Sequence, residues 1–365
     1  MARILFVTWE GGGNVPPALG IAAELARRGD TVRFLGHPQQ REQIEAAGFR
    51  FEAFTSARPW SATARTGPVG YLAMFTDAGP GRDLTASVAR EPVDLAVIDC
   101  LSLSPLRAAQ EAGLRRVVLA HTFYAYLVRC WSRGPLALAA AFRGYRPVRL
   151  WESAEEVLVT TLPELDPARQ RPLPPNVHWT GPVLPTGARP ASPEEPRILV
   201  SLSTIHYPPQ ARALQAILDA VAELPVHAVV ATGHAVDPAT LRAPGNAELH
   251  RFLPHAEVMP GVSLVVGHGG HGTTLQALAH DLPLVVMPMH PMLDQPVIGK
   301  VVEERGAARV VRANASPGTI RAAVTDLLTS ASHREAAAKL GDRIRSGNGA
   351  EAAADRIVAL AATPV

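Results

Sequence analysis

Two spacings of apolar residues alternate along this chain. Short apolar runs at residues 4–7, 32–35, 95–98 and 117–119 have the length of strands whose two faces are both covered. A helical pattern made of Leu19, Ile21, Ala22 and Leu25 follows the first run, and Gly29 ends it. A second helix is expected near residues 107–112. Strands that alternate with helices predict an α/β fold built on a parallel sheet.

The same alternation returns in the second half of the chain. Apolar runs at 198–201, 228–231, 264–267 and 284–287 predict strands, and residues 210–222 predict a helix. Between them and the first half, residues 172–196 are rich in proline, which is typical of a linker between domains. We therefore predict two Rossmann-like doubly wound domains, 1–190 and 191–348, that bind ligand in a cleft at the carboxyl ends of their sheets.

The segment from Leu264 to Thr274 runs from an apolar strand directly into a glycine-rich helix start. The first turn of a helix leaves backbone N–H groups without partners, and glycines let an anion come close to them. His268 stands where its ring can contact a bound phosphate. After the next strand come Asp294 and Gln295, whose side chains can accept and donate hydrogen bonds to vicinal hydroxyls.

These motifs resemble the donor-sugar signature of GT-B glycosyltransferases, in particular the inverting branch that modifies antibiotics and other natural products. The resemblance spans nearly the whole chain and implies the GT-B fold. It implies that diphosphate binds at His268, Gly270, Gly272 and Thr273, and that Asp294 and Gln295 hold the hexose. It further implies a second phosphate loop at Ser203 and Thr204, a nucleobase stacked on Phe252 beside Leu253, and a C-terminal helix, 349–365, that packs back on the first domain.

The chain departs from the family pattern in its donor half. His271 stands at a position that is usually small or apolar, two extra residues precede Asp294, and Ile298 replaces a frequent asparagine. Residue types leave the nucleotide, UDP or TDP, and the sugar undetermined.

The larger departure is in the loop after the first strand. The family usually has a histidine there that removes the proton from the acceptor hydroxyl, but alignment on Gly13 and Pro17 puts Asn14 in its place. An asparagine side chain cannot act as a base. Asp99, which normally orients that histidine, is present. Three explanations stay open: Asp99 is the base, which we put first; Glu10, His37 or His121 takes over; or the acceptor needs little activation.

Composition narrows the function further. The 35 lysines and arginines nearly balance the 33 aspartates and glutamates, and no basic run interleaves with aromatics, so a nucleic-acid partner is not expected. Two cysteines without metal-ligand spacing favour a reducing cytoplasm, and no apolar run has the length of a membrane span or the pattern of a signal peptide. Aromatic residues gather at 57–80 and 123–145, which suits a flat, hydrophobic acceptor.

We therefore predict an inverting, cytoplasmic glycosyltransferase of secondary metabolism, for example of antibiotic biosynthesis. It moves a hexose from a nucleotide sugar to a small hydrophobic aglycone. The nucleotide sugar is a co-substrate, no metal or other cofactor is expected because no Asp-x-Asp motif lies near the donor loop, and the protein is expected to be a monomer or homodimer. Two alternatives are a sugar-nucleotide epimerase of the same fold and a nucleotide-sugar binding protein that has lost catalysis.

Overall fold

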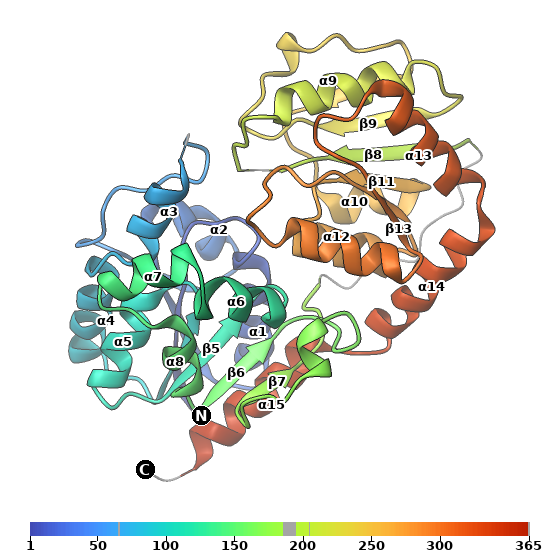
Figure 1. The fold of residues 1–365 in the computed structure, drawn as a ribbon. Helices are drawn as coiled ribbons and strands as arrows, with labels where there is room; N and C mark the ends of the chain where they lie inside the picture. Colours follow the sequence, from blue (N-terminus) through green and yellow to red (C-terminus); the bar gives the residue numbers. More distant parts are fainter. Residues whose placement is uncertain (65, 185–194, 204, 364–365) are drawn as a thin grey trace. The chain divides into compact units, whose positions relative to one another are not determined.

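The computed structural model describes residues 1–64, 66–184, 195–203 and 205–363. The expected domain boundary near position 191 and the expected phosphate-binding Thr204 lie outside the described residues. The chain forms two compact units (Figure 1). The first contains Met1–Ala62, Thr66–Val183 and the C-terminal segment from Asn348, and the main part of the second is Leu184–Gly347.

The first unit is built on a seven-stranded sheet in the order β3-β2-β1-β4-β5-β6-β7, with every neighbouring pair parallel. Its strands are β1 (Arg3–Val7), β2 (Thr31–Gly36), β3 (Arg50–Ala53), β4 (Leu95–Asp99), β5 (Arg116–Ala120), β6 (Glu156–Val159) and β7 (Val177–Trp179). The central strands β4 and β5 are buried along their whole length, which explains why their sequences are continuous apolar runs rather than alternating ones.

Helices connect these strands. They are α1 (Val15–Arg27), α2 (Arg41–Ala46), α3 (Pro68–Phe75), α4 (Gly79–Arg90), α5 (Leu103–Glu111), α6 (Tyr124–Ser132), α7 (Pro135–Phe142) and α8 (Pro147–Glu152). The strands and the two helices expected from the apolar pattern of this half are present. Helices α3, α6 and α7 fall in the aromatic-rich stretches, where the pattern gave no helical prediction, and α2, α4 and α8 were not predicted either.

The linker prediction for residues 172–196 is wrong in part. Val177–Trp179 forms the edge strand β7, which pairs with β6 in parallel register. The strand is only three residues long, and the prolines before it stand outside the ladder, where a missing N–H is tolerated. A proline-rich composition therefore concealed the last strand of the sheet.

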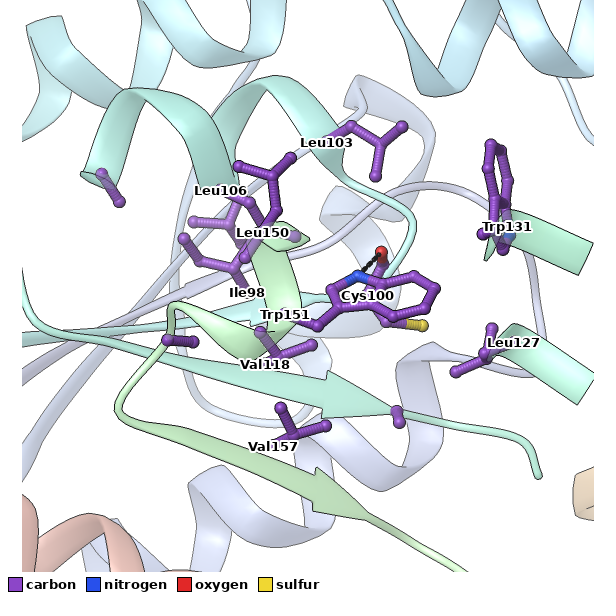
Figure 2. Close-up of a cluster of buried hydrophobic side chains, with 14 of the residues drawn as sticks. Ile98, Cys100, Leu103, Leu106, Val118, Leu127, Trp131, Leu150, Trp151 and Val157 are labelled. Atoms are coloured by element: carbon purple, nitrogen blue, oxygen red, sulfur yellow. Dashed lines mark hydrogen bonds between the residues drawn. The ribbon is translucent and has the colours of Figure 1, made fainter. Parts of the chain in front are cut away.

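One face of the first sheet packs around Trp151, which is fully buried (Figure 2). Its indole Nε1 donates a 2.9 Å hydrogen bond to the backbone oxygen of Cys100, immediately after β4. Leu106, Val118 and Val157 lie in the same cluster. This contact satisfies the one polar atom of the tryptophan in an apolar core and fixes the backbone that follows Asp99.

The last helix, α15 (Gly349–Ala362), belongs to the first unit although it ends the chain. Ala353, Ala354 and Ile357 are buried in the cluster that α1 and the other face of the sheet form. Ion pairs of Arg28 with Asp355 and of Arg356 with Glu156 flank this contact. Two segments more than 300 residues apart in sequence therefore share one core.

The second unit carries a six-stranded sheet in the order β10-β9-β8-β11-β12-β13, also parallel throughout. Its strands are β8 (Arg197–Ser201), β9 (His227–Ala231), β10 (Ala247–His250), β11 (Leu264–Gly267), β12 (Leu284–Val286) and β13 (Ala308–Val310). Its helices are α9 (Gln210–Val221), α10 (His255–Val258), α11 (His271–Ala279), α12 (Gln295–Glu304), α13 (Pro317–Thr329) and α14 (Ala331–Arg345). The predicted strand at 284–287 ends one residue earlier than expected.

Within the described ranges, no helix combines the length and the apolar character needed to cross a bilayer.

Candidate functional site

Each sheet has one point at which its strand order reverses. In the first sheet this point lies between the adjacent strands β1 and β4, and in the second between β8 and β11. The connections that leave the two strands run to opposite faces of the sheet, so a crevice opens at their carboxyl ends, where open α/β sheets bind ligands. Trp9 and Asn14 follow β1, Asp99 ends β4, and His121 follows the next strand, β5.

Asp99 is the centre of a buried hydrogen-bond network in the first unit. Its Oδ1 accepts from the indole Nε1 of Trp9 at 3.0 Å and from the backbone N–H of Leu101 at 2.9 Å. Its Oδ2 accepts from the Asn14 amide at 3.3 Å and lies 2.9 Å from Nδ1 of His121. The carboxylate is only 3% exposed, and these donors replace the water that it loses on burial.

His121 is held by this carboxylate through Nδ1, which leaves Nε2 as the ring nitrogen that can take up a proton from a substrate. Its side chain is 14% exposed. Burial lowers the pKa of His121, but the charge of Asp99 and the hydrogen bond to it outweigh burial, so the pKa is raised well above its ordinary value of 6.5. The pair is an imidazole oriented by a carboxylate, as in many sites of acid–base chemistry.

Asn14 lies beside Asp99, where the family resemblance puts the base histidine. Its Nδ2 also donates to the Trp9 backbone oxygen at 3.0 Å and to Thr8 Oγ1 at 3.1 Å, and its side chain is buried. The amide therefore closes the loop after β1 around the carboxylate. Gly11 fits this loop because a Cβ there would overlap the Trp9 ring at 2.4 Å.

The two other candidate bases of this region hold loops together. Glu10 Oε2 accepts from the backbone N–H of Ala62 at 2.9 Å, and burial, opposed by this bond, raises its pKa. His37 Nδ1 accepts from the backbone N–H of Glu10 at 3.2 Å, and burial lowers the His37 pKa to about 4. A histidine that is neutral and already accepts through Nδ1 serves the loop rather than proton transfer.

A chain of aromatic rings covers the Trp9 side of the network. Trp9 packs edge-on against Trp60 and Phe75, Tyr71 contacts both of these rings, and Phe75 also packs on Trp131. A small hollow beside them is lined by Trp9, Met74, Phe75, Asp77 and Leu101, among others. The two aromatic-rich stretches of the sequence therefore meet next to Asp99, whereas Tyr124 stacks into the core with Trp151 and Trp179.

Cys100 brings a thiol to the same cluster. Within the part of the chain that the structure describes, Asp99, Cys100 and His121 form a group of metal-ligand type, with one donor atom of each within 4.8 Å of the others. Burial and the charge of Asp99 raise the pKa of the Cys100 thiol, whereas a metal ligand must be a thiolate. Because both oxygens of Asp99 already accept hydrogen bonds, we interpret the group as a hydrogen-bonded cluster.

The reversal point of the second sheet brings Ser203, which follows β8, next to His268, which follows β11. Helix α11 begins at His271 with Gly270 as its N-cap, and neither a capping side chain nor an acidic residue serves its first turn. Among the described residues, no capping side chain therefore occupies the N–H groups at this end, where the helix dipole is positive. This arrangement is suited to a phosphate.

The glycines of this loop have separate structural reasons. Gly269 has φ +83°, and a Cβ there would lie 2.8 Å from Val286 and 2.9 Å from the backbone oxygen of Gln295. A Cβ on Gly270 would lie 2.5 Å from the His268 ring. A Cβ on Gly272, on the first turn of α11, would meet no described atom within 4 Å outside its own helix. Two of the glycines are thus required by packing, and the third leaves space above the helix end.

These differences predict opposite results for two alanine substitutions. Gly269→Ala is expected to lower the free energy of unfolding by about 1–3 kcal/mol, because of backbone strain and the two overlaps. Gly272→Ala is expected to leave stability unchanged or to raise it by up to about 1 kcal/mol, since alanine is the better helix residue, while it weakens nucleotide binding. Urea unfolding and calorimetric titration with nucleoside diphosphates test both. Equal destabilisation by the two substitutions would contradict this account.

His268 is partly buried, and its ring is tilted against the ring of Tyr207, with 6.4 Å between centroids. Burial, with a smaller contribution from His255, lowers the pKa of His268 to about 4, although a hydrogen bond with the Ser201 backbone acts in the opposite direction. The ring is therefore neutral near pH 7. His255 contacts Ser201 Oγ through Nε2 at 3.0 Å, and burial lowers its pKa as well.

The acid–amide pair lies at the start of α12, but its two members differ. Gln295 is buried, and its Oε1 accepts from the backbone N–H groups of Met289 at 2.7 Å and His290 at 3.1 Å. Its oxygen thus fixes the loop after β12, and its amide nitrogen is the group that can reach a ligand. Asp294 is the N-cap residue and is partly exposed.

Phe252 is 61% exposed, so its ring does not serve core packing. Leu253 beside it is half-buried. In the other predicted donor loop, after β8, Ser203 Oγ accepts a hydrogen bond from the backbone N–H of Ile205 at 2.9 Å. An aromatic side chain that is left in solvent suits the stacking role expected for it.

The chain was compared with known proteins. Residues 215–360 match the family described as erythromycin biosynthesis protein CIII-like, C-terminal domain. The 4'-demethylrebeccamycin synthase of Lentzea aerocolonigenes is 25% identical over 98% of this chain and 99% of its own.

Solved structures give the same result. The glycotransferase of kitacinnamycin superposes with a TM-score of 0.83 at 24% identity, over 98% of this chain and 99% of its own. The calicheamicin glycosyltransferase CalG4 gives 0.79 at 26% identity, over 99% and 98%. The chain is a glycosyltransferase with the GT-B fold. A third structure, the glycosyltransferase VinC in complex with dTDP, gives 0.75 at 20% identity, over 98% and 99%.

The glycosyltransferase thus has the fold that its motifs predicted, two parallel-sheet α/β units of GT-B type. In the first unit, Asn14, Asp99 and His121 meet after β1, β4 and β5. In the second unit, His268 follows β11 at the reversal point, whereas Phe252 follows the edge strand β10 and Asp294 follows β12. Trp9 was missed because a tryptophan after a strand gives no chemical signal by itself. His255 was missed because its contact with Ser201 joins segments 54 residues apart.

Proposed function

We propose that this glycosyltransferase transfers a hexose, with inversion, from a UDP- or TDP-sugar to a small hydrophobic natural-product aglycone. His121 acts as the general base and Asp99 orients it. The observation that carries this proposal is the 2.9 Å contact of His121 Nδ1 with Asp99 Oδ2 in a chain whose usual base position is Asn14. Asp99, which we put first from the sequence, is a poor base because four N–H groups already surround it.

In this mechanism the acceptor hydroxyl donates to Nε2 of His121 as its oxygen attacks the anomeric carbon, and the bond to the diphosphate breaks on the opposite face. The imidazolium that forms is stabilised by the Asp99 carboxylate. In the second unit, the first-turn N–H groups of α11 and the neutral His268 donate to the diphosphate as its negative charge grows. Asp294 and the amide nitrogen of Gln295 are assigned to sugar hydroxyls, and Phe252 to the base.

The donor and acceptor classes have different support. The VinC complex with dTDP supports a thymidine nucleotide as the donor, and uridine remains the other member of the class. The ring chain of Trp9, Trp60, Tyr71, Phe75 and Trp131 supports an aromatic or otherwise flat aglycone. Incubation with donor and a panel of phenolic and macrocyclic aglycones, with the anomeric configuration of the product read by NMR, tests the proposal. Consumption of donor without an acceptor, with an epimeric sugar nucleotide as the product, would overturn it.

His268 is expected to couple nucleotide binding to proton uptake. Its pKa of about 4 in the free protein rises when a diphosphate binds beside it, so affinity increases as the pH falls toward the pKa of the complex. Titration calorimetry of UDP and TDP in buffers of different ionisation enthalpy measures this uptake. His268→Gln removes the part of the uptake that belongs to the ring and leaves the part that belongs to the nucleotide phosphate. Identical uptake by wild type and variant would contradict the phosphate assignment.

We also expect transfer to proceed unchanged in the presence of a chelator. The neutral donors at the α11 end and the imidazole of His268 supply the stabilisation that a metal otherwise gives to a departing diphosphate. Initial rates with and without EDTA, after dialysis, measure this directly. A rate that falls with EDTA and returns with added Mg²⁺ or Mn²⁺ would contradict a metal-independent mechanism.

A further inference from the structure

Two helices of the first unit are apolar on all sides. Helix α3 reads Pro-Val-Gly-Tyr-Leu-Ala-Met-Phe, and helix α7 reads Pro-Leu-Ala-Leu-Ala-Ala-Ala-Phe. They contact each other, and Figure 1 shows them side by side at the rim of the first unit. Such helices are normally buried on every side or lie against lipid.

Burial explains only their inner sides. Leu72 and Ala140 are buried, and Phe75 packs on Trp9 and Trp131. On the outside, Val69 is 74% exposed, Leu138 60% and Phe142 84%. Large apolar side chains in solvent stabilise nothing in the free protein, and a cluster of them marks an interaction surface. We call Val69, Leu138, Phe142 and the two helices that carry them the α3–α7 face.

Positive charge is concentrated in the segment of the chain that contains α7. Between Thr122 and Trp151 the chain carries no lysine and no acidic residue but five arginines, all exposed: Arg129, Arg133, Arg143, Arg146 and Arg149. The chain as a whole has a net charge of only +2, so the arginines are concentrated here. Next to this segment, Arg107 lies 3.8 Å from the carboxylate of the exposed Glu111.

Two of these arginines border a pocket at the end of α7. Arg107, Gln110, Ala141, Gly144, Arg146, Arg149 and Leu150 line a hollow of about 360 Å³. Arg107 is fixed in it, since its guanidinium lies 4.1 Å from the Tyr145 ring centroid and donates to the Tyr145 hydroxyl at 2.9 Å. Arg146 and Arg149 thus form a cationic opening, and the exposed ring of Phe142 lies on the neighbouring helix end. This arrangement is complementary to a lipid, because the arginines can bind its anionic head group and the ring can contact its acyl chain.

We infer that the α3–α7 face docks on an anionic lipid bilayer, with Val69, Leu138 and Phe142 in the interfacial region and the arginines on lipid phosphates. Apolar side chains flanked by arginine are the physical signature of interfacial binding, and the arginine charge selects a negatively charged surface. A second copy of the chain fits this face poorly, because a two-fold contact would bring the two sets of arginines together. A nucleic acid is a poorer fit, because the apolar side chains of Val69, Leu138 and Phe142 would contribute no binding energy to contacts with its phosphates.

Docking at this face would bring the candidate acceptor side of the enzyme close to the membrane. Phe75 on α3 belongs to the ring chain that reaches Trp9, which donates to Asp99, so the docked face and the candidate acceptor side share one helix. A lipophilic acceptor dissolved in the bilayer would then be concentrated where it is needed. Bilayer docking requires no sugar transfer, so this inference can be tested independently of the proposed function.

Co-sedimentation of the full chain with vesicles tests this inference without donor or acceptor. We expect binding to phosphatidylcholine vesicles that contain phosphatidylglycerol, weak binding to phosphatidylcholine alone, and loss of binding at high salt. Arg146→Gln with Arg149→Gln should weaken binding by about tenfold or more, given the gain per arginine near an anionic surface. Leu138→Gln with Phe142→Gln should weaken it on both kinds of vesicle.

A matched control removes two exposed arginines elsewhere, Arg82→Gln on α4 with Arg212→Gln on α9, and should leave vesicle binding unchanged. Thermal unfolding checks the fold of each variant. Phe142→Trp, which keeps an aromatic ring, gives a second measurement, because its added emission should be quenched by brominated lipids. The inference would be overturned if the protein bound neither kind of vesicle, if it bound both equally, or if the control variant lost as much binding. It would also be overturned if the protein formed a dimer that Phe142→Gln dissociates and did not bind vesicles.

Discussion

Replacement of His121 by alanine is expected to lower the turnover number by about 10²–10⁴-fold, the usual contribution of a positioned general base. Nucleotide affinity should not change, because the diphosphate site that we propose is built from the second unit. His121 is held at 2.9 Å from Asp99 and is the candidate base whose ring retains a nitrogen for the acceptor proton. Single-turnover transfer assays combined with titration of UDP or TDP separate the two quantities.

The pH profile provides an independent test of the same residue. The raised pKa means that His121 is largely protonated near pH 7, and only the neutral ring can act as a base. Turnover should therefore rise with pH and level off above the raised pKa, and this rise should be missing in His121→Ala. The pair also stabilises the fold below the ordinary pKa of 6.5, and this stabilisation is lost as the pH rises through the raised value.

His178 offers a control for the loss of an imidazole as such. It lies on β7, 3.3 Å from the Glu156 carboxylate, in the same unit but away from the β1–β4 reversal point. His178→Ala should retain the turnover and the pH profile of the wild type. Should His121→Ala keep full turnover, the base would have to be sought elsewhere, or the acceptor would need none.

Asp99→Asn is expected to reduce turnover by a factor of about 10³ or more and to destabilise the fold by about 1–3 kcal/mol, because a buried donor loses its acceptor. The carboxylate receives N–H groups on both oxygens, from Trp9 and Leu101 on one and from Asn14 and His121 on the other. An asparagine has a single oxygen, so its NH₂ group must face one of these two pairs of donors. Urea unfolding and turnover measure the two effects.

Asp166 separates the two effects of that substitution. It is buried to a similar degree and accepts the N–H groups of Tyr124, Ala125 and Ala168 and the indole of Trp179. Asp166→Asn should cost comparable stability while turnover is retained. If both variants lose turnover equally, the effect of Asp99→Asn is general destabilisation, and the orientation of His121 is not the cause.

The fold followed from the sequence because parallel strands covered on both faces must be continuous apolar runs. The runs at β1, β2, β4, β5, β8, β9, β11 and β12 could all be recognised in this way. The edge strands β3, β7, β10 and β13 could not, because they are half-solvated, short or preceded by proline. The internal strand β6 (Glu156–Val159) was also not predicted, although three of its four residues are buried, because its apolar run is very short.

Among the site residues, those close together in the sequence could be predicted, and contacts between distant segments could not. The turn from Gly267 to Gly272 could be recognised because an anion-binding helix start requires glycines that stand together in the sequence. The contact between Asp99 and His121 could not, since it joins the ends of β4 and β5, and sequence spacing leaves its geometry open. Likewise, Gln295 was expected to hold sugar hydroxyls together with Asp294, and only the structure revealed that its amide oxygen accepts from Met289 and His290.

The return of α15 to the first unit constrains how this enzyme can be recombined with its relatives. Ala353, Ala354 and Ile357 complete a core whose other members come from β1, α1 and their neighbours. A chimera joined at a single crossover after β7 would pair a foreign terminal helix with this core and leave cavities in it. Two crossovers, the second near Asn348, keep the helix with its own partners, so donor halves are best exchanged as an internal cassette.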